Sequence, residues 1–312
     1  MVLRTEVGLD NYTNEDHRYW GLTTYYIKNV SASANQGKPA IQIGNTTRQT
    51  FRNTNTLNYD FRKFLGEDHQ LSALAGHEYV VLKEKVLTNV VHGFPESFTA
   101  SQAWKLSTQG VPYSIDNFHH ADDILLSFFG RLNYSYKSKY LLSATYRADG
   151  SSKFGENNKW GYFPSAAVAW RMSSESFMEG SKSWLDDLKM RLSFGTAGNN
   201  NIPRGQITQV YQSSSTAWIN GFGNYWAPSK TMANPDLKWE TTVTRNLGLD
   251  FTLLGGRLSG TLDAYQNTTK DLLIQFPTQG TGYDNQYRNM GKTENRGLEA
   301  TINWVAINKK DY

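Results

Sequence analysis

Strict alternation of apolar and polar residues governs the stretch from residue 124 to residue 171. The alternation divides into three runs, separated by one tight connection and one longer polar connection that contains glycine. A period of two residues is typical of β-strands, because successive side chains point to opposite faces of a sheet. Each predicted strand therefore has one apolar and one polar face. The apolar face carries Ile124, Leu126, Phe128, Leu132, Tyr134, Tyr136, Tyr140, Leu142, Ala144, Tyr146, Ala166, Val168 and Trp170.

The length of these runs separates two folds that share the pattern. In a soluble sandwich the apolar face packs against a second sheet, whereas in an outer-membrane barrel it meets lipid and the polar face lines a wet lumen. The runs last about ten residues or more. Soluble strands cluster near about 5 to 6 residues, while a tilted membrane strand needs about 9 to 11. Length therefore favours the barrel.

The same alternation continues toward the C-terminus. A long hairpin is predicted from Thr241 to Leu254 and from Arg257 to about Leu273, and a last strand contains Leu298, Ala300, Ile302 and Trp304. In all, the sequence predicts about ten long antiparallel strands. Their connections alternate between short and long, which is typical of a barrel with tight periplasmic turns and extended outer loops. The short turns include a tight hairpin at Ser138 and Lys139.

The remaining segments are predicted to be connections or shorter elements. A strand pair is expected at roughly Thr47–Phe64 and His69–Leu82. Residues 173–188 are predicted to be helical in part, with Ser173 or Ser174 as the cap. Three long connections are predicted, from Asn14 to about Thr46, from Val86 to Asp123 and from Gly198 to Leu237.

Composition agrees with a membrane barrel and limits other classes. The chain has no cysteine, which excludes disulfides and thiolate metal sites, and no apolar run long enough for a transmembrane helix. Aromatic residues make up 13%, yet the mean hydropathy is −0.58, which suits strands with only one lipid-facing side. The 32 basic and 28 acidic residues are interspersed, without the basic stripe that nucleic acid requires. No signal peptide is visible at the N-terminus.

Several segments together resemble a known family. The chain resembles the barrel of SusC/RagA-type TonB-dependent outer-membrane transporters, in the family's order and over nearly its whole length. The segments that carry the resemblance are FGRLNYSYKSKYLLSATYRADGSSKFG (129–155), NKWGYFPSAAVAWR (158–171), LKMRLSFGTAGN (188–199), NPDLKWETT (234–242), NLGLDF (246–251) and ENRGLEATIN (294–303).

The resemblance implies a barrel of about 22 strands, filled by an N-terminal plug domain and located in the outer membrane of a Gram-negative bacterium. It also implies a TonB complex that acts through the plug, a SusD-like surface lipoprotein, and oligosaccharide or peptide cargo. It implies no cofactor and no enzymatic activity. Residues 1–312 lack the plug and are expected to form part of one barrel domain. About ten strands cannot close a barrel of about 22. The two open edges would leave backbone groups unsatisfied in lipid, at a cost of several kcal/mol per group. We therefore expect a fragment that aggregates when purified alone.

Two sets of residues are candidates for function. The outer loops contain Trp218, Tyr225, Trp226 and Trp104, whose flat rings suit sugar faces or peptide side chains; the alternative is that they pack within the loops or lie in an interface girdle. The polar face predicts lumen-facing side chains that contact plug or cargo, provided that the register is correct. These are Arg131, Arg147, Asp250 and Glu299.

Other polar groups favour structural roles. The DGSSKFG segment from Asp149 could hold calcium, but it lacks the alternating acids of a calcium loop, and a strand-to-loop cap is the preferred interpretation. Joint metal ligation by His119 and His120, with Asp116, Asp122 and Asp123 nearby, would need a loop conformation, because neighbours on a strand point to opposite faces. Asp186 and Asp187 are interpreted as solvated charges rather than an acid/base pair. Arg245 falls on an apolar face, where it marks a register break, a bulge or a charge paired with a neighbour.

Two alternative functions remain open at this stage. A soluble, secreted glycan-binding β-sandwich would share the aromatic residues and the alternation, but its apolar faces would have to pair. An outer-membrane hydrolase would need a nucleophile, a base and an orienting acid on one strand face, and the sequence offers no such Ser, His and Asp grouping.

Overall fold

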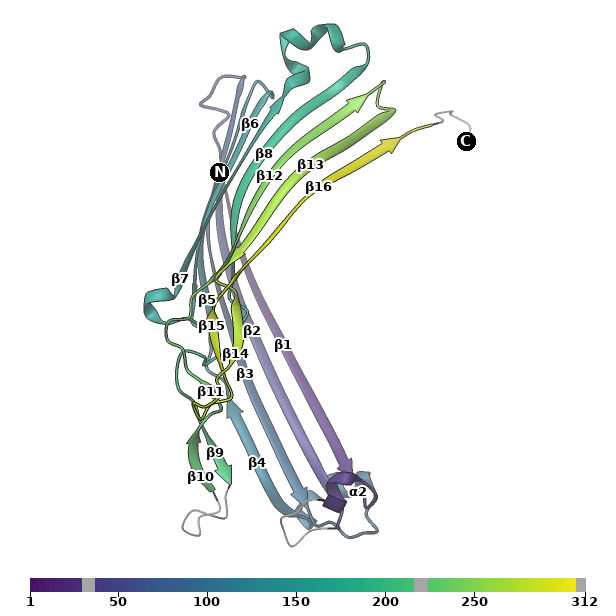
Figure 1. The fold of residues 1–312 in the computed structure, drawn as a ribbon, viewed down its shortest axis with the longest axis vertical. Helices are drawn as coiled ribbons and strands as arrows, with labels where there is room; N and C mark the ends of the chain where they lie inside the picture. Colours follow the sequence, from purple (N-terminus) through teal and green to yellow (C-terminus); the bar gives the residue numbers. More distant parts are fainter. Residues whose placement is uncertain (30–36, 216–223, 307–312) are drawn as a thin grey trace. The chain divides into compact units, whose positions relative to one another are not determined.

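A single sheet of eleven strands dominates the computed structural model, which describes residues 1–29, 37–215 and 224–306. Ten strands follow one another in the order β1-β2-β3-β5-β6-β7-β8-β12-β13-β16, and β4 pairs with β3 (Figure 1). The strands are β1 (Val2–Trp20), β2 (Ala40–Asp60), β3 (His69–His92), β4 (Val111–His119), β5 (Asp123–Tyr136), β6 (Tyr140–Ser151), β7 (Trp160–Arg171), β8 (Leu185–Asn199), β12 (Glu240–Leu253), β13 (Leu258–Lys270) and β16 (Lys292–Trp304).

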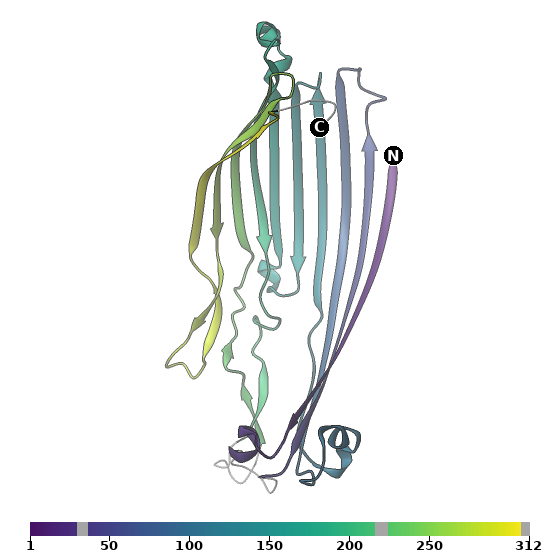
Figure 2. The ribbon, with the colours of Figure 1, turned by 90° about the vertical axis from the view of Figure 1, so that its right-hand side faces the viewer.

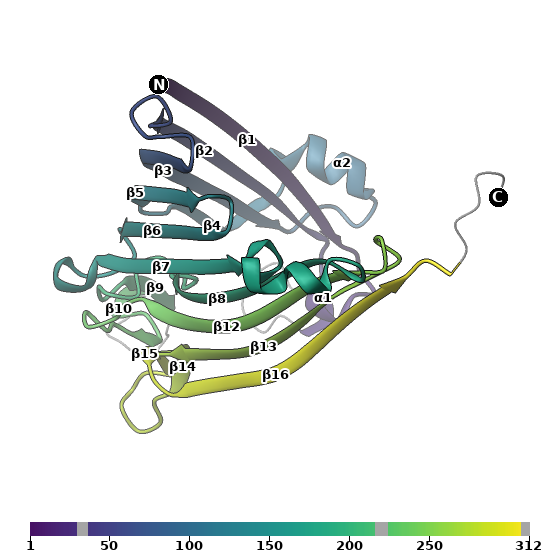
Figure 3. The same cartoon turned by 90° about the horizontal axis from the view of Figure 1, so that it is seen from above.

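The prediction of about ten long strands is confirmed. The pairs from β5 to β16 are antiparallel, and β1 and β16 end the strand order, so the sheet is open in the described part of the chain. The predicted hairpin around Gly255 and Gly256 is also present, between β12 and β13. Figure 2 shows the strands from β5 to β16 side by side, and Figure 3 shows the same order from above.

Contacts divide the chain into two compact units. The first unit contains residues 1–6, 53–79 and 124–312, and the second contains residues 7–52 and 80–123. Strands β1, β2 and β3 each contribute to both units. Every site described below lies within one unit.

The long connections predicted near the N-terminus were too long. β1 continues to Trp20 and β2 begins at Ala40, so both ends of the predicted loop from Asn14 to Thr46 are strand. β3 continues to His92, and β4 pairs with it inside the predicted connection from Val86 to Asp123. The polar run 14–18 and the adjacent apolar pairs Val86–Leu87 and Val90–Val91 interrupt the period of two. Hydrogen bonds between neighbouring strands form whether or not the side chains alternate between apolar and polar. A strand end predicted from hydropathy alone therefore comes too early.

The predicted irregular segment from Gly198 to Leu237 contains short strands. β11 pairs in parallel with β15, an exception to the antiparallel rule, and β15 pairs with β14. None of the helices in the described residues is long and apolar enough to cross a membrane. The short elements are α1 (Tyr25–Asn29), α2 (Ala100–Lys105), η1 (Ser107–Gln109), η2 (Glu156–Asn158), η3 (Met172–Ser174), η4 (Ser176–Ser181), β9 (Tyr211–Ser215), β10 (Asn224–Pro228), β11 (Thr231–Met232), β14 (Leu273–Pro277) and β15 (Asn285–Asn289).

Two local predictions need correction. The segment 173–188 is helical only as the 3₁₀ turns η3 and η4, and neither turn has a side-chain cap. Ser173 and Ser174 lie inside η3, whose N-cap position is Arg171, and the Ser173 hydroxyl donates to Asp187 Oδ1 at 2.7 Å. The tight hairpin between β5 and β6 turns at Lys137 and Ser138, one residue earlier than predicted. Both residues have positive φ angles, of 49° and 55°, as a type I′ turn requires.

Buried apolar residues form two small clusters rather than a layer under the sheet. One cluster, in the second unit, consists of Ile41, Phe94 and Ala103. The other, in the first unit, consists of Phe154, Phe163, Ile202, Leu237 and Trp239. Apolar side chains on the sheet stay exposed, including Leu192 at 54% and Leu247 at 50%. In the ranges that the structure describes, no second long-stranded sheet covers that face, so the β-sandwich alternative is wrong for this part of the chain.

Candidate functional site

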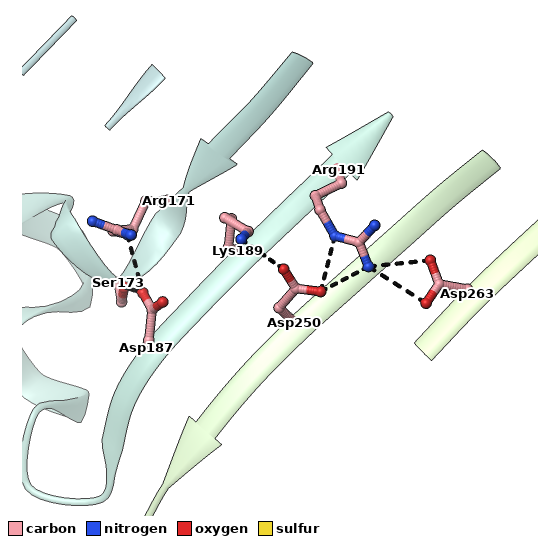
Figure 4. Close-up of polar contacts among 7 residues, drawn as sticks. All are labelled: Arg171, Ser173, Asp187, Lys189, Arg191, Asp250 and Asp263. Carbon is pink, nitrogen blue, oxygen red and sulfur yellow. Dashed lines mark hydrogen bonds and ion pairs between the residues drawn. The ribbon is translucent and has the colours of Figure 1, made fainter. Parts of the chain in front are cut away.

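A cluster of charged side chains lies on the polar face of β8, β12 and β13 (Figure 4). Arg191 Nε donates to Asp250 Oδ1 at 2.9 Å, and its Nη2 donates to Asp263 Oδ1 at 3.1 Å. Lys189 Nζ lies 2.8 Å from Asp250 Oδ2. Two cations and two carboxylates thus neutralise one another across three adjacent strands. We call Lys189, Arg191, Asp250 and Asp263 the charged cluster.

Strand register explains how Arg191 reaches two strands away. Arg191 lies opposite Gly248 on β12, and Gly248 lies opposite Asp263 on β13. A Cβ atom at position 248 would come within 2.6 Å of both Arg191 Nη2 and Asp263 Oδ1. The absence of a side chain at Gly248 therefore leaves room for the Arg191 guanidinium to cross β12 and reach Asp263.

Further charges extend this face at both sides of the charged cluster. Glu299 on β16 lies directly opposite Asp263 and is exposed; two carboxylates in this position repel each other. Near the β7–β8 connection, Arg171 Nε lies 3.4 Å from Asp187 Oδ1 (Figure 4). The neighbouring Asp186 accepts a hydrogen bond from the backbone of Gly256 at 3.0 Å.

Arg147 organises a second polar group on β5 and β6. Its Nε donates to Asp149 Oδ1 at 2.7 Å, and its Nη2 donates to Ser127 Oγ at 2.9 Å. Its guanidinium also lies 5.5 Å from the centre of the Phe129 ring, a distance at which cation–π attraction acts. Arg131 donates to Thr145 Oγ1 at 3.1 Å. Asp149, considered above for calcium, is thus the ion-pair partner of Arg147.

The segments that carry the family resemblance meet in the apolar cluster of the first unit. Phe163 and Trp239 pack edge to face with ring centres 5.4 Å apart, and Trp239 Nε1 donates to Lys159 O at 3.0 Å. Asn200 Nδ2 donates to Ser151 Oγ at 3.1 Å. A Cβ at Gly198 would come within 2.0 Å of Phe163 Cζ. These contacts give DGSSKFG, WGYF, TAGN and DLKW a packing role, in agreement with the structural interpretation of DGSSKFG.

The structure describes the predicted cargo-binding aromatics unevenly. Trp218 lies outside the described residues, and Tyr225 and Trp226 have only their backbone described, paired with β9 at Ser214 and Ser213. Trp104 is half-buried on α2, and its Nε1 donates to Arg18 O at 3.4 Å. Its ring lies 5.2 Å from that of His17. These contacts of Trp104 fit loop packing.

His119 and Arg245 were also considered from the sequence. The side chain of His119 is not described, and the described residues contain no group of three or more side chains suited to holding a metal. Arg245 sits in an unbroken register between Phe194 and Gln266. Its guanidinium lies 5.9 Å from the centre of the Phe194 ring. A bulge or register break is therefore excluded at Arg245, and a neighbouring ring stabilises its charge.

Sequence reasoning missed a carboxylate at the turn end of the sheet. Glu175, between η3 and η4, accepts hydrogen bonds from Tyr140 OH at 2.7 Å, Trp170 Nε1 at 3.1 Å and Lys139 Nζ at 3.2 Å. The hydrogen bond from Tyr140, followed by those from Trp170 and Lys139, holds the pKa of Glu175 below its usual value. No periodicity signals this contact, because its members come from three separate connections and strand ends.

The opposite face of the sheet is a series of apolar rows. Strand register aligns Tyr140, Trp170 and Met190 in one row and Leu142, Val168 and Leu192 in the next. Aromatic contacts lie at two levels of the face, at Tyr136–Tyr140 and at Tyr146–Tyr162, each pair with ring centres 6.3 Å apart. Apolar rows between aromatic rings are typical of a sheet that faces lipid.

An open antiparallel sheet with one apolar face and one charged face defines the class of protein, a wall segment of a β-barrel. The chain belongs to the TonB dependent receptor-like, beta-barrel family, whose model matches residues 4–309.

Individual relatives agree with this family. The chain is 38% identical to TonB-dependent receptor SusC of Bacteroides thetaiotaomicron, over 71% of this chain and 23% of SusC. It is 30% identical to a TonB-dependent receptor of Formosa agariphila, over 100% of this chain and 30% of the relative. The structure of the RagAB peptide transporter superposes with a TM-score of 0.81 at 26% identity, over 99% of this chain and 32% of that one. The chain thus spans about a third or less of the length of these relatives.

Proposed function

We propose that these residues form part of the barrel wall of a TonB-dependent importer in the outer membrane of a Gram-negative bacterium. The observation that carries the proposal is the division of one sheet into exposed apolar rows and a charged face. A surface that exposes Leu192, Leu247 and Leu298 by half or more is stable in lipid and costly in water. Its other face offers ion-paired side chains suited to a wet lumen.

The polar face supplies the working surface of the proposed importer. Arg131, Arg147, Asp250 and Glu299 share that face by strand parity and register. They would contact a plug domain or passing cargo. Arg131 and Glu299 are exposed, whereas Asp250 is held by Lys189 and Arg191.

Partners and cargo follow from the relatives. The solved relative is the RagAB peptide transporter, and the sequence resembles the SusC group. We therefore propose oligosaccharides or peptides as cargo, a SusD-like surface lipoprotein as partner, and the TonB complex as the source of energy. An enzymatic role is not part of the proposal, since the family consists of transporters.

Uptake in cells tests the proposed function. A strain that carries the complete protein should accumulate a labelled oligosaccharide or peptide mixture, and accumulation should fall to background when the gene or the TonB system is deleted. The complete protein should also fractionate with the outer membrane. Uptake that persists without TonB, or recovery of the protein without detergent, would overturn the proposal.

Cargo contact by the outer-loop aromatics is a separate part of the proposal. In the complete protein, Trp226→Ala should weaken ligand affinity several-fold and leave surface expression unchanged, because the indole ring supplies a flat apolar face. Trp226→Phe is the matched control and should retain most of the affinity. Equal affinity of the alanine variant and the parent would remove Trp226 from the binding surface.

A further inference from the structure

The segment between β7 and β8, residues 172–184, exposes two large aromatic side chains. Phe177 is 65% exposed and Trp184 is 51% exposed. The segment is short and built from 3₁₀ turns, so it has no core of its own in which to bury them. Large exposed rings on so small an element indicate a surface that contacts something apolar.

Phe177 continues the apolar face of the sheet. Its ring packs edge-on against Trp170, with ring centres 6.2 Å apart. Trp170 aligns with Tyr140 on one side and Met190 on the other, and both of these are 40% exposed or more. Phe177 is thus contiguous with the row of Tyr140, Trp170 and Met190 on the apolar face.

Glu175 binds the polar edges of the aromatic rings in this row. The carboxylate binds the polar edges of both rings, Tyr140 OH and Trp170 Nε1, and also binds Lys139. A carboxylate with these three donors favours the hydrated side of a membrane boundary, while the ring bodies favour the apolar side. Glu175 thus binds the polar edge of Trp170, while Phe177 packs against the ring of the same residue.

The segment also contains an exposed ion pair. Glu179 and Lys182 form an ion pair at 3.7 Å, and their side chains are 69% and 63% exposed. A short element with charged residues on one part and aromatic residues on another is suited to lying in the plane of a membrane interface.

We infer that the β7–β8 segment is an interfacial anchor, with Phe177 inserted at the boundary between lipid headgroups and acyl chains. The inference rests on the proposed function, in which the apolar face of the sheet meets lipid. Lipid is the occupant because Phe177 is continuous with that face through Trp170. A protein partner would instead be expected to cover a patch separate from the apolar rows.

Site-directed spin labelling tests the anchor, because these 312 residues contain no cysteine. A nitroxide is attached to Phe177→Cys in the complete protein, in phosphatidylethanolamine/phosphatidylglycerol vesicles, and its collision rates with oxygen and with a water-soluble nickel chelate are measured. Val168→Cys on the apolar face is the lipid reference, and Glu179→Cys is the matched water reference within the same segment. Heat-modifiable migration on gels verifies that each variant is folded.

The anchor predicts that the ratio of oxygen to nickel collisions at Phe177→Cys is several-fold higher than at Glu179→Cys and approaches that at Val168→Cys. A ratio at 177 equal to that at 179, with 168 still in lipid, overturns the anchor and leaves the proposed function intact. Low access to both reagents at 177 also overturns it, since protein would then cover the site. Water access at both 168 and 177 would refute the membrane location itself.

Discussion

Arg191 and Asp263 form an ion pair at 3.1 Å although a complete strand, β12, lies between their own strands. The pair spans Gly248, which faces both residues in register. A methyl group at this position would occupy the space of the guanidinium. The glycine in NLGLDF is therefore part of the charged cluster, although it has no charge.

Gly248→Ala should uncouple Arg191 from Asp263. In a double-mutant cycle with Arg191→Gln and Asp263→Asn, we expect a coupling of about 1 kcal/mol or less in the parent, since the pair is partly exposed. The coupling should fall to near zero in the Gly248→Ala background. Urea unfolding of the complete protein in lipid vesicles measures it. The Arg191–Asp250 coupling is the internal control, and an unchanged Arg191–Asp263 coupling would contradict the geometry.

Gly198→Ala should destabilise the protein more strongly than Gly248→Ala. The added Cβ would meet the ring of Phe163, which is only 6% exposed and is held by Trp239. Overpacking of this kind costs about 1 to 3 kcal/mol, more than the gain of about 0.5 to 1 kcal/mol from replacing glycine in a strand.

Gly130→Ala is the matched control for this prediction, because its added Cβ would lie at an ordinary 3.7 Å from Leu74 O. Thermal unfolding in vesicles should show a lower midpoint for Gly198→Ala and an equal or higher midpoint for Gly130→Ala. Equal midpoints for both variants would mean that Phe163 repacks freely.

Glu175 should make the turn end of the sheet sensitive to acid. Its pKa is lowered in the folded protein by hydrogen bonds from Tyr140, Trp170 and Lys139. Its contribution to stability is therefore present above the usual glutamate pKa of about 4.5 and is lost as the pH falls through the lower folded value. Glu175→Gln should be less stable than the parent at neutral pH, and the difference should shrink as the pH falls below the usual glutamate pKa.

The control for Glu175 is Glu179→Gln, which removes only an exposed ion pair with Lys182. Unfolding curves at a series of pH values should be nearly the same for this variant and the parent, since exposed pairs contribute little. A stability difference for Glu175→Gln that stays constant down to acid pH would show that the charge of Glu175 is not the stabilising element.

Alternation located the long strands because one face of each must be apolar, and this set the register of Arg131, Arg147, Asp250 and Glu299. It failed where the period of two is interrupted, by the polar run 14–18 near the end of β1 and by the adjacent apolar pairs Val86–Leu87 and Val90–Val91 near the end of β3. In β4 the alternation of Val111, Tyr113 and Ile115 is too short to single out a strand. The alternation pattern also could not predict contacts between segments that are distant in the sequence. The approach of Asp250 and Asp263 to Arg191 depends on strand order, and the three donors of Glu175 come together only at the ends of folded strands.

Leu247 provides the last prediction, because it tests what the apolar face meets. It lies in register with Leu192 and, through Leu192, with Val168, between the two aromatic levels of that face, whereas Leu249 aligns with Met190 at one of those levels. In lipid, an arginine costs about 2 to 4 kcal/mol near the bilayer centre and about 0 to 1 kcal/mol near its boundary. Leu247→Arg should therefore lower the free energy of unfolding by about 2 kcal/mol or more, while Leu249→Arg should lower it by less than about 1 kcal/mol.

Leu247→Gln is the matched control, since it is polar but uncharged, and it should fall between the parent and Leu247→Arg. Guanidinium unfolding of the complete protein in vesicles measures the parent and the three variants. On a face that met water, Leu247→Arg would be an ordinary surface change within about 0.5 kcal/mol of the parent. The difference between the costs at positions 247 and 249 therefore separates a lipid-facing wall from a wet one.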